Sequence, residues 1–215
     1  MRFATISKIL LVLILPVLLF LAVFTFVGFD ESFYEEKFAE HKVNRSLPTP
    51  VLLNEKVINF VKGKSNELPG EFNEREKRHL EDVRNVVQTS TIILYSLISL
   101  FVVLLLASIF VLKINNLITN FMGKVLIFGG ALTIVLAGLL YLMINLDFAS
   151  TFESFHQLFF KQGSYLFDPS KEMLVRIYPE QLFMDLGARI SKWAIFASVI
   201  VVALGLFLLF KSKRK

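Results

Sequence analysis

The chain contains no cysteine, and this absence removes several classes of chemistry. Without thiols there is no disulfide framework, no cysteine nucleophile, no cysteine metal site and no cysteine-borne lipid anchor. Histidine is also scarce, since the 215 residues include only three, His41, His79 and His156. Three imidazoles are too few for a typical all-protein transition-metal site unless carboxylates complete it, so we expect no metal.

The common motifs for nucleotide and hydrolytic chemistry are missing as well. The chain has no Gly-rich phosphate loop, no HExxH zinc motif and no GxSxG nucleophile elbow. Its net charge of +5 would raise the question of nucleic acid in a soluble protein. Here the basic residues sort by position relative to long apolar runs, so membrane topology explains them better and no nucleic-acid partner is expected.

Charge is absent from four long stretches, which are residues 9–29, 91–112, 125–146 and 193–210. Crossing a bilayer takes about 20 apolar residues. One Asp, Lys or Arg at a helix centre would cost about 2.5–3.5 kcal/mol on insertion scales, so the absence of charge is informative. Because backbone polar groups in lipid must be paired within the segment, we expect four transmembrane helices.

Acidic residues are absent from the short flanks of these stretches, whereas basic residues are common there. All 18 acidic residues lie in two long loops, 30–88 and 147–191. The positive-inside rule therefore puts both termini and the link between the second and third stretches in the cytoplasm. We predict an all-α integral membrane protein with a single membrane domain, 1–215. Its two extracytoplasmic loops are expected to form a small, partly helical cap at the membrane interface.

Small residues recur every seven positions in the third stretch, at Gly123, Gly130 and Ala137. This spacing keeps them on one face of a helix, which favours close packing against another helix in lipid.

The first outer loop contains three helical patterns. Acidic and aromatic residues alternate at roughly helical spacing over 31–40, and a second short helix is indicated around 57–61. Asn73 with Glu76 forms a capping box, which predicts a third helix running on into the second stretch. His79 lies on this helix about 18 Å before residue 91 if the helix is straight. We therefore expect the helix to tilt or break, or protein to cover His79.

The second outer loop is rich in phenylalanine. Phenylalanines spaced three and four apart predict a helix over 148–159 that is apolar on one face and carries His156 near the interface. A turn is expected over 163–169 and a short element over 173–176. Pro179 then suits the first turn of another interfacial helix.

The histidines are the main candidates for chemistry, because their unperturbed pKa lies between pH 5 and 8. His79 and His156 fall on the same side of the membrane, which indicates an acid/base catalyst at the membrane surface. The alternative is a four-helix membrane protein with incidental histidines. His41 lies in a charged segment and is expected at the surface. Arg176 is as suited to pairing with a loop carboxylate or a lipid phosphate as to binding a substrate.

Two histidine segments carry a resemblance to a known family. The segment EREKRHLEDVR precedes the second stretch, and FESFHQLFF, followed by YPEQLF, comes after the third. With the order of spans and the loop lengths, these segments resemble the bacterial lipoprotein intramolecular transacylase family over essentially the whole chain.

The resemblance implies a specific reaction in the bacterial cell membrane, with the active face extracytoplasmic. The enzyme would move an acyl chain from the glyceryl sn-2 oxygen of a diacylated lipoprotein to the α-amine of its N-terminal Cys, giving a lyso-form lipoprotein. His79 and His156 would be catalytic. We assign the role of base to His156, because it is nearer the interface where the esters lie, and His79 would then orient the base or stabilise charge. Arg176, Tyr165 and Tyr178 would bind substrate, although Tyr165 stands where we would expect a larger aromatic such as Trp.

The resemblance implies no cofactor, and the partners would be the lipoprotein and the bilayer. The sequence leaves the oligomeric state open and slightly favours a monomer. Two alternatives stay open. One is another membrane lipid esterase or acyltransferase, and the other is a non-enzymatic four-helix membrane partner. A transporter is less favoured, because no stretch carries an ionisable residue for a substrate path.

Overall fold

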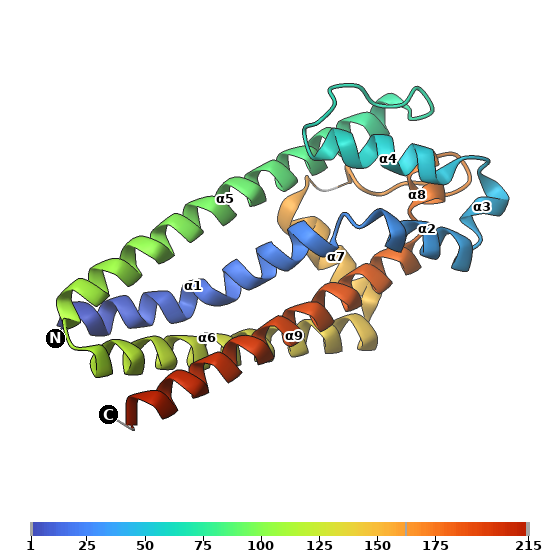
Figure 1. The fold of residues 1–215 in the computed structure, drawn as a ribbon. Coiled ribbons are helices and arrows are strands. Elements are labelled where there is room, and N and C mark those ends of the chain that lie inside the picture. The colour runs from blue at the N-terminus through green and yellow to red at the C-terminus, as the bar shows by residue number, and fades with distance from the viewer. Residues whose placement is uncertain (1, 162, 214–215) are drawn as a thin grey trace. The chain divides into compact units, whose positions relative to one another are not determined.

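A computed structural model describes residues 2–161 and 163–213, and helices are the regular elements among them (Figure 1). No strand occurs among these residues. In chain order the helices are α1 (Arg2–Val27), α2 (Glu31–Glu40), α3 (Val43–Ser46), α4 (Pro50–Val61), α5 (Glu74–Leu112), α6 (Asn115–Leu146), α7 (Phe148–Phe159), α8 (Met173–Ile177) and α9 (Glu180–Lys213).

Four of these helices, α1, α5, α6 and α9, are long and apolar enough to cross a membrane. This confirms the prediction of four long apolar helices. Two of the helices extend well beyond their apolar stretches, because α5 begins at Glu74 and α9 begins at Glu180. The interfacial helix predicted near Pro179 does begin there, but it continues without a break to Lys213, so it and the fourth stretch are one helix.

The chain divides into two compact units. The first comprises Met1–Thr25, Ile92–Leu142 and Ile190–Lys215, and the second comprises Phe26–Thr91 and Met143–Arg189. The first unit therefore holds the apolar parts of the four long helices. The second holds the short helices together with the polar ends of α5 and α9.

Small residues allow close helix contact within the first unit. A Cβ added at Gly123 of α6 would lie 2.9 Å from the carbonyl oxygen of Gly205 in α9, and one at Gly130 would lie 2.7 Å from Val202 Cγ2. The expected packing role of the seven-residue spacing is thus confirmed. Between α1 and α5, the hydroxyls of Ser7 and Ser108 share a hydrogen bond of 2.7 Å. Both hydroxyls also lie within hydrogen-bonding distance of the carbonyl oxygen of Leu104, Ser7 at 3.3 Å and Ser108 at 2.7 Å, so polar groups of α1 and α5 pair with one another in an apolar setting.

The start of α5 in the second unit follows the predicted capping box. Asn73 Oδ1 accepts a hydrogen bond from the backbone N–H of Glu76 at 3.0 Å, and Glu76 Oε2 accepts one from the N–H of Asn73 at 2.7 Å. Two of the free N–H groups at the helix start are satisfied in this way. The helix is then unbroken past His79, which is buried by surrounding protein. Of the three outcomes considered for His79, covering by protein is the one observed.

A single residue, Asp147, separates α6 from α7 and caps the start of α7. The Asp147 carboxylate accepts a hydrogen bond from the N–H of Ser150 at 3.1 Å. The helix is amphipathic, since His156 is buried while Leu158 is 75% exposed. In the first loop, α2 has the predicted limits. Helix α4 begins earlier than predicted, with Pro50 in its first turn.

Candidate active site

Helices α5 and α7 bring His79 and His156 together within the second unit. The two ring centroids lie 6.3 Å apart and the ring planes differ by 18°. Only 7% of His79 and 8% of His156 is exposed. The residues are 77 positions apart in the chain (156 minus 79), so tertiary structure alone creates this pair.

Aromatic rings enclose both imidazoles. The ring centroids of Phe160 and Phe167 lie 4.9 and 5.4 Å from that of His79. Those of Phe152 and Tyr165 lie 4.0 and 4.8 Å from that of His156. Phenylalanines of the second loop therefore form part of the wall around the histidines.

This enclosure keeps both histidines neutral. Removal from water lowers the pKa of His79 to about 4, with smaller contributions from the positive charges of a protonated His156 and of Arg75. Burial also lowers the pKa of His156, against opposing contributions from its hydrogen bond to Phe152 and from Glu153. Loss of solvation disfavours the charged form of a histidine, so near pH 7 both rings present a lone pair.

A local hydrogen bond selects the tautomer of His156. Its Nδ1 lies 2.8 Å from the carbonyl oxygen of Phe152, one helical turn earlier. A carbonyl oxygen only accepts hydrogen bonds, so Nδ1 carries the proton. In the neutral ring Nε2 is then the basic nitrogen. A backbone contact of this kind is the usual means of orienting a histidine that acts as a base.

His79 has an unpaired nitrogen. Its Nδ1 is buried, and no residue in the described part of the chain hydrogen-bonds to it. An unsatisfied buried polar atom costs roughly 1–3 kcal/mol, so such atoms are uncommon and call for an explanation. A polar atom of a bound substrate would provide the missing partner.

Tyr165 joins the pair to a carboxylate. Its hydroxyl donates a hydrogen bond of 2.8 Å to Glu153 Oε1, which also accepts one of 2.9 Å from Gln157 Nε2. These bonds lower the pKa of Glu153, so the group stays ionised next to His156. Of the predicted substrate-binding residues, Tyr165 is the one whose ring contacts a histidine.

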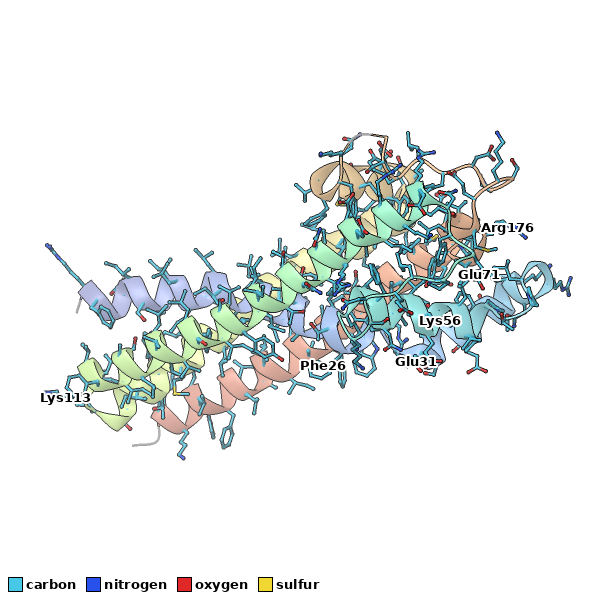
Figure 2. The ribbon with its side chains drawn as sticks, turned by 90° about the horizontal axis from the view of Figure 1, so that it is seen from above. Phe26, Glu31, Lys56, Glu71, Lys113 and Arg176 are labelled. Carbon is cyan, nitrogen blue, oxygen red and sulfur yellow. The ribbon has the colours of Figure 1, made fainter. Side chains whose placement is uncertain are left out.

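The other two predicted substrate-binding residues lie elsewhere in the second unit. The hydroxyl of Tyr178 donates a hydrogen bond of 2.9 Å to Asn54 Oδ1, and its ring contacts Tyr34 and Phe38. Burial raises the pKa of Tyr178. Arg176 is exposed on α8 (Figure 2). A substrate-binding role for Tyr178 and Arg176 stays a prediction.

The family model of the lipoprotein intramolecular transacylase Lit matches residues 5–183 of the chain. The chain belongs to this family. It is therefore an acyltransferase by family and an integral membrane protein with four apolar helices. None of the curated protein sequences matches it.

Solved structures of the lipoprotein intramolecular transacylase Lit from Bacillus cereus share the fold. One has a TM-score of 0.86 at 19% identity, covering 100% of this chain and 99% of that one. Two others carry a replacement of one histidine. The arginine variant has a TM-score of 0.80 at 18% identity, covering 99% and 95% of the two chains. The alanine variant has a TM-score of 0.81 at 18% identity, covering 100% and 97%.

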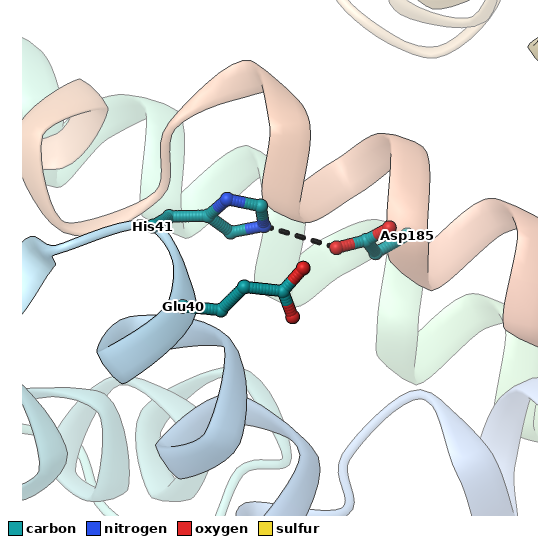
Figure 3. A group of neighbouring side chains, drawn as sticks. All are labelled: Glu40, His41 and Asp185. Carbon is teal, nitrogen blue, oxygen red and sulfur yellow. Dashed lines mark hydrogen bonds and ion pairs between the residues drawn. The ribbon is translucent and has the colours of Figure 1, made fainter.

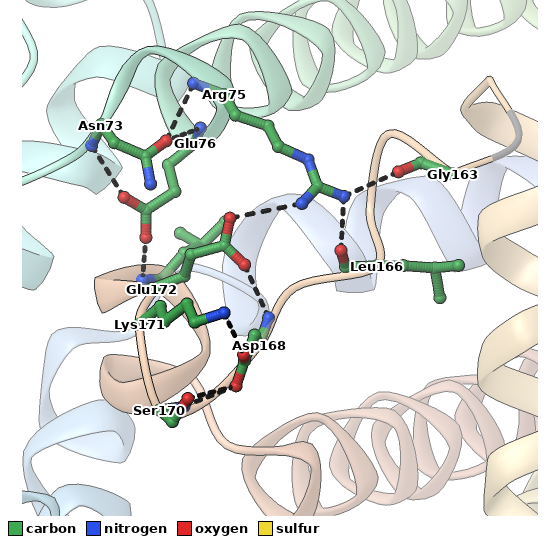
Figure 4. A network of polar contacts seen from close by, with 10 residues as sticks. Asn73, Arg75, Glu76, Gly163, Leu166, Asp168, Ser170, Lys171 and Glu172 are labelled. Atoms are coloured by element: carbon green, nitrogen blue, oxygen red, sulfur yellow. Dashed lines mark hydrogen bonds and ion pairs between the residues drawn. The ribbon is translucent and has the colours of Figure 1, made fainter.

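Two residues near the transacylase histidine pair were not predicted from the sequence. Arg75 and Glu172 form an ion pair with an N–O distance of 3.3 Å (Figure 4). The positions are 97 residues apart, and no local pattern connects them. The one available signal was that Arg75 lies inside the segment that carries His79.

The third histidine lies in a separate cluster. His41 Nε2 is 2.9 Å from Asp185 Oδ2, and Glu40 is beside them (Figure 3). One nitrogen of His41 and one carboxylate oxygen each of Glu40 and Asp185 lie within 4.8 Å of one another, which is close enough for these atoms to hold a metal ion. However, Lys37 Nζ already contacts both carboxylates, at 2.5 Å from Glu40 and 3.1 Å from Asp185. The lysine supplies the positive charge for the two carboxylates, so this is an ion-pair cluster. His41 is partly buried in it, whereas the sequence predicted a surface position.

Proposed function

We propose that this transacylase moves the acyl chain from the sn-2 oxygen of a lipoprotein's diacylglyceryl group to the α-amine of its N-terminal Cys. The observation that carries the proposal is the pair of neutral, enclosed histidines, one of which has its Nε2 selected as the basic nitrogen. The family assignment supports the reaction class.

His156 acts as the general base. The α-amine of the substrate has a pKa of about 7.7–8.0, so it must lose a proton to become a nucleophile. The ammonium form first releases this proton to solvent. As the nitrogen of the neutral amine then bonds to the ester carbonyl carbon, His156 Nε2 takes a second proton from that nitrogen. The negative charge of Glu153 nearby favours the imidazolium that results. A positioned base typically contributes about 10²–10⁴-fold to the rate.

His79 stabilises the tetrahedral intermediate. Because its pKa is lowered to about 4, it meets the substrate as a neutral ring that donates one N–H to the developing oxyanion. The carbon–oxygen bond to the glyceryl group then breaks, and the departing oxygen takes the proton back from His156. An amide and a free sn-2 hydroxyl result, with no water consumed. Because amine and ester belong to one molecule, positioning supplies much of the rate enhancement.

The reaction takes place at the outer face of the bacterial cell membrane. The acidic outer loops and basic flanks support an orientation with both termini in the cytoplasm. Helix α7 also exposes the apolar side chains of Phe155, Leu158 and Phe159. These side chains support an interfacial position for the segment that carries His156.

Mass spectrometry of one lipoprotein's N-terminal lipopeptide tests this proposal. Cells with and without the protein are compared, together with the His79→Ala and His156→Ala variants at matched expression. We expect the wild type to convert the free-amine diacylglyceryl form to the N-acyl lyso form, with unchanged total mass and altered fragment ions. Both variants should leave the free amine. Release of free fatty acid without an N-acyl product would indicate an esterase instead.

A further inference from the structure

The segment between α7 and α8 provides part of the wall around the histidine pair. From Gly163 to Glu172 it has no helix, and Gly163 takes the left-handed φ of 81° that favours glycine. This segment, called here the covering loop, carries Tyr165 against His156 and Phe167 against His79. Its conformation therefore decides whether these two rings cover the histidines.

A single side chain, Arg75 in the first turn of α5, holds the covering loop at several points (Figure 4). Its guanidinium donates hydrogen bonds to the carbonyl oxygen of Gly163 at 2.9 Å, to that of Leu166, and to Glu172 Oε1 at 3.3 Å. It also lies over the ring of Phe167, 5.0 Å from the ring centroid. Arg75 thus contacts the start, middle and end of the loop.

The end of the covering loop is held by buried carboxylates. Glu172 is 8% exposed, and its Oε2 accepts a hydrogen bond of 2.6 Å from the N–H of Asp168. Glu76 is 1% exposed, and its Oε1 accepts one of 2.6 Å from the N–H of Leu174 at the start of α8. The same helical turn of α5 therefore fixes the loop on both sides, and His79 follows one turn later on that helix.

We propose that Arg75 is a positioning residue for the transacylase reaction: it sets the covering loop so that Phe167 and Tyr165 enclose His79 and His156. This inference rests on the proposed function for its catalytic meaning. The guanidinium suits the task because its planar set of five N–H donors reaches three acceptors while one face lies on a ring. A lysine has the charge but not this geometry.

The test compares Arg75→Ala and Arg75→Lys with Lys77→Ala in the full-length protein in micelles. Lys77 is a matched control, since it lies in the same part of α5 and, within 2–161 and 163–213, its side chain pairs with the exposed Glu74 alone. We expect the exchange of backbone amides in 163–172 to speed up in both Arg75 variants and to stay unchanged in Lys77→Ala. The kcat should fall about 10²-fold, because displacement by about 1 Å has that effect. KM should change less.

The histidine signals give a readout that is independent of activity. With isotope-labelled histidine, the ring signals of His79 and His156 should shift in Arg75→Lys as the nearby rings move, whereas that of His41 should not. Unchanged loop exchange and unchanged His79 signals in both variants would overturn the inference, as would full kcat in Arg75→Lys. If Arg75→Ala fails to fold, Arg75→Lys decides. If the wild type transfers no acyl chain, the proposed function fails, while exchange and histidine signals still decide whether Arg75 orders the loop.

Discussion

The second unit holds two kinds of histidine environment, which differ in the groups that surround the imidazole ring. His41 is partly buried between charged groups, with its Nε2 on Asp185 and Lys37 beside it. His79 and His156 are enclosed by rings, with the pKa of each lowered by burial. Burial among rings disfavours the charged form of a histidine and leaves a lone pair on the neutral ring for a substrate, whereas Nε2 of His41 is already occupied by Asp185. Aromatic enclosure rather than contact with charged groups therefore distinguishes His79 and His156 from His41.

The largest effect that tests this comparison is on the rate. Replacing His156 by alanine removes the proposed base, so we expect kcat to fall by about 10²–10⁴-fold. His41→Ala is the matched control and should keep kcat within about twofold, because His41 belongs to the ion-pair cluster. Acyl transfer on a purified lipoprotein in micelles gives both rates.

Combining His79→Ala with His156→Ala sharpens the result. Groups that act on one transition state are strongly non-additive, so the double variant should be about as slow as the worse single variant. If the falls in kcat of the two single variants multiplied in the double variant, the two rings would act independently. A His156→Ala variant with the kcat of the wild type would contradict the proposed mechanism.

The next effect concerns stability in acid. An unfolded histidine has a pKa of about 6.5, whereas that of folded His79 is about 4. Between these two pH values His79 is protonated in the unfolded state and neutral in the folded state. The free energy of unfolding is therefore highest above pH 6.5 and falls as the pH drops towards 4. The His79 contribution to this loss should be roughly 3 kcal/mol by pH 4. Thermal unfolding followed by circular dichroism at pH 7 and pH 4.5 measures it.

His79→Phe is the control for acid stability, since it keeps a ring but cannot take a proton. Its unfolding temperature should depend less on pH than that of the wild type, with the remaining dependence owed partly to His156. An unchanged pH dependence would mean that His79 is not protected from protonation by its surroundings.

A smaller effect is expected at the hydroxyl that links the pair to a carboxylate. Tyr165→Phe keeps the ring on His156 but removes the hydrogen bond to Glu153. The lost bond is worth about 1 kcal/mol, so kcat should fall about fivefold. Glu153→Gln should produce a fall of similar size, and initial rates of acyl transfer check both. A loss as large as that of His156→Ala would give Tyr165 a direct role in the chemistry.

The smallest effect belongs to the ion-pair cluster. Asp185→Asn removes a partner of both Lys37 and His41 at a partly exposed position. Such pairs are worth about 0–1 kcal/mol, so the unfolding temperature should fall slightly and acyl transfer should be unchanged. A large loss of activity would contradict the separation of the two environments.

Local sequence was sufficient to predict the elements that depend on neighbouring residues. The capping box of Asn73 and Glu76 starts α5 as expected, and the phenylalanine spacing forms α7 over its predicted range. Local sequence was not sufficient for the continuity of α9, because nothing near Pro179 shows that the helix runs on through the apolar stretch. It also gave no sign that Arg75 would hold the covering loop, since its acceptors lie 88 to 97 residues away.

The sequence by itself determined the membrane class, the four apolar helices and the candidate histidines. These follow from length, the absence of charge and the spacing of side chains, all of which act within one segment. Tertiary structure alone decided that His79 and His156 meet, that aromatic rings keep them neutral and that His41 is paired instead. Enclosure and pKa depend on what surrounds a side chain in space, and those neighbours come from distant parts of the chain.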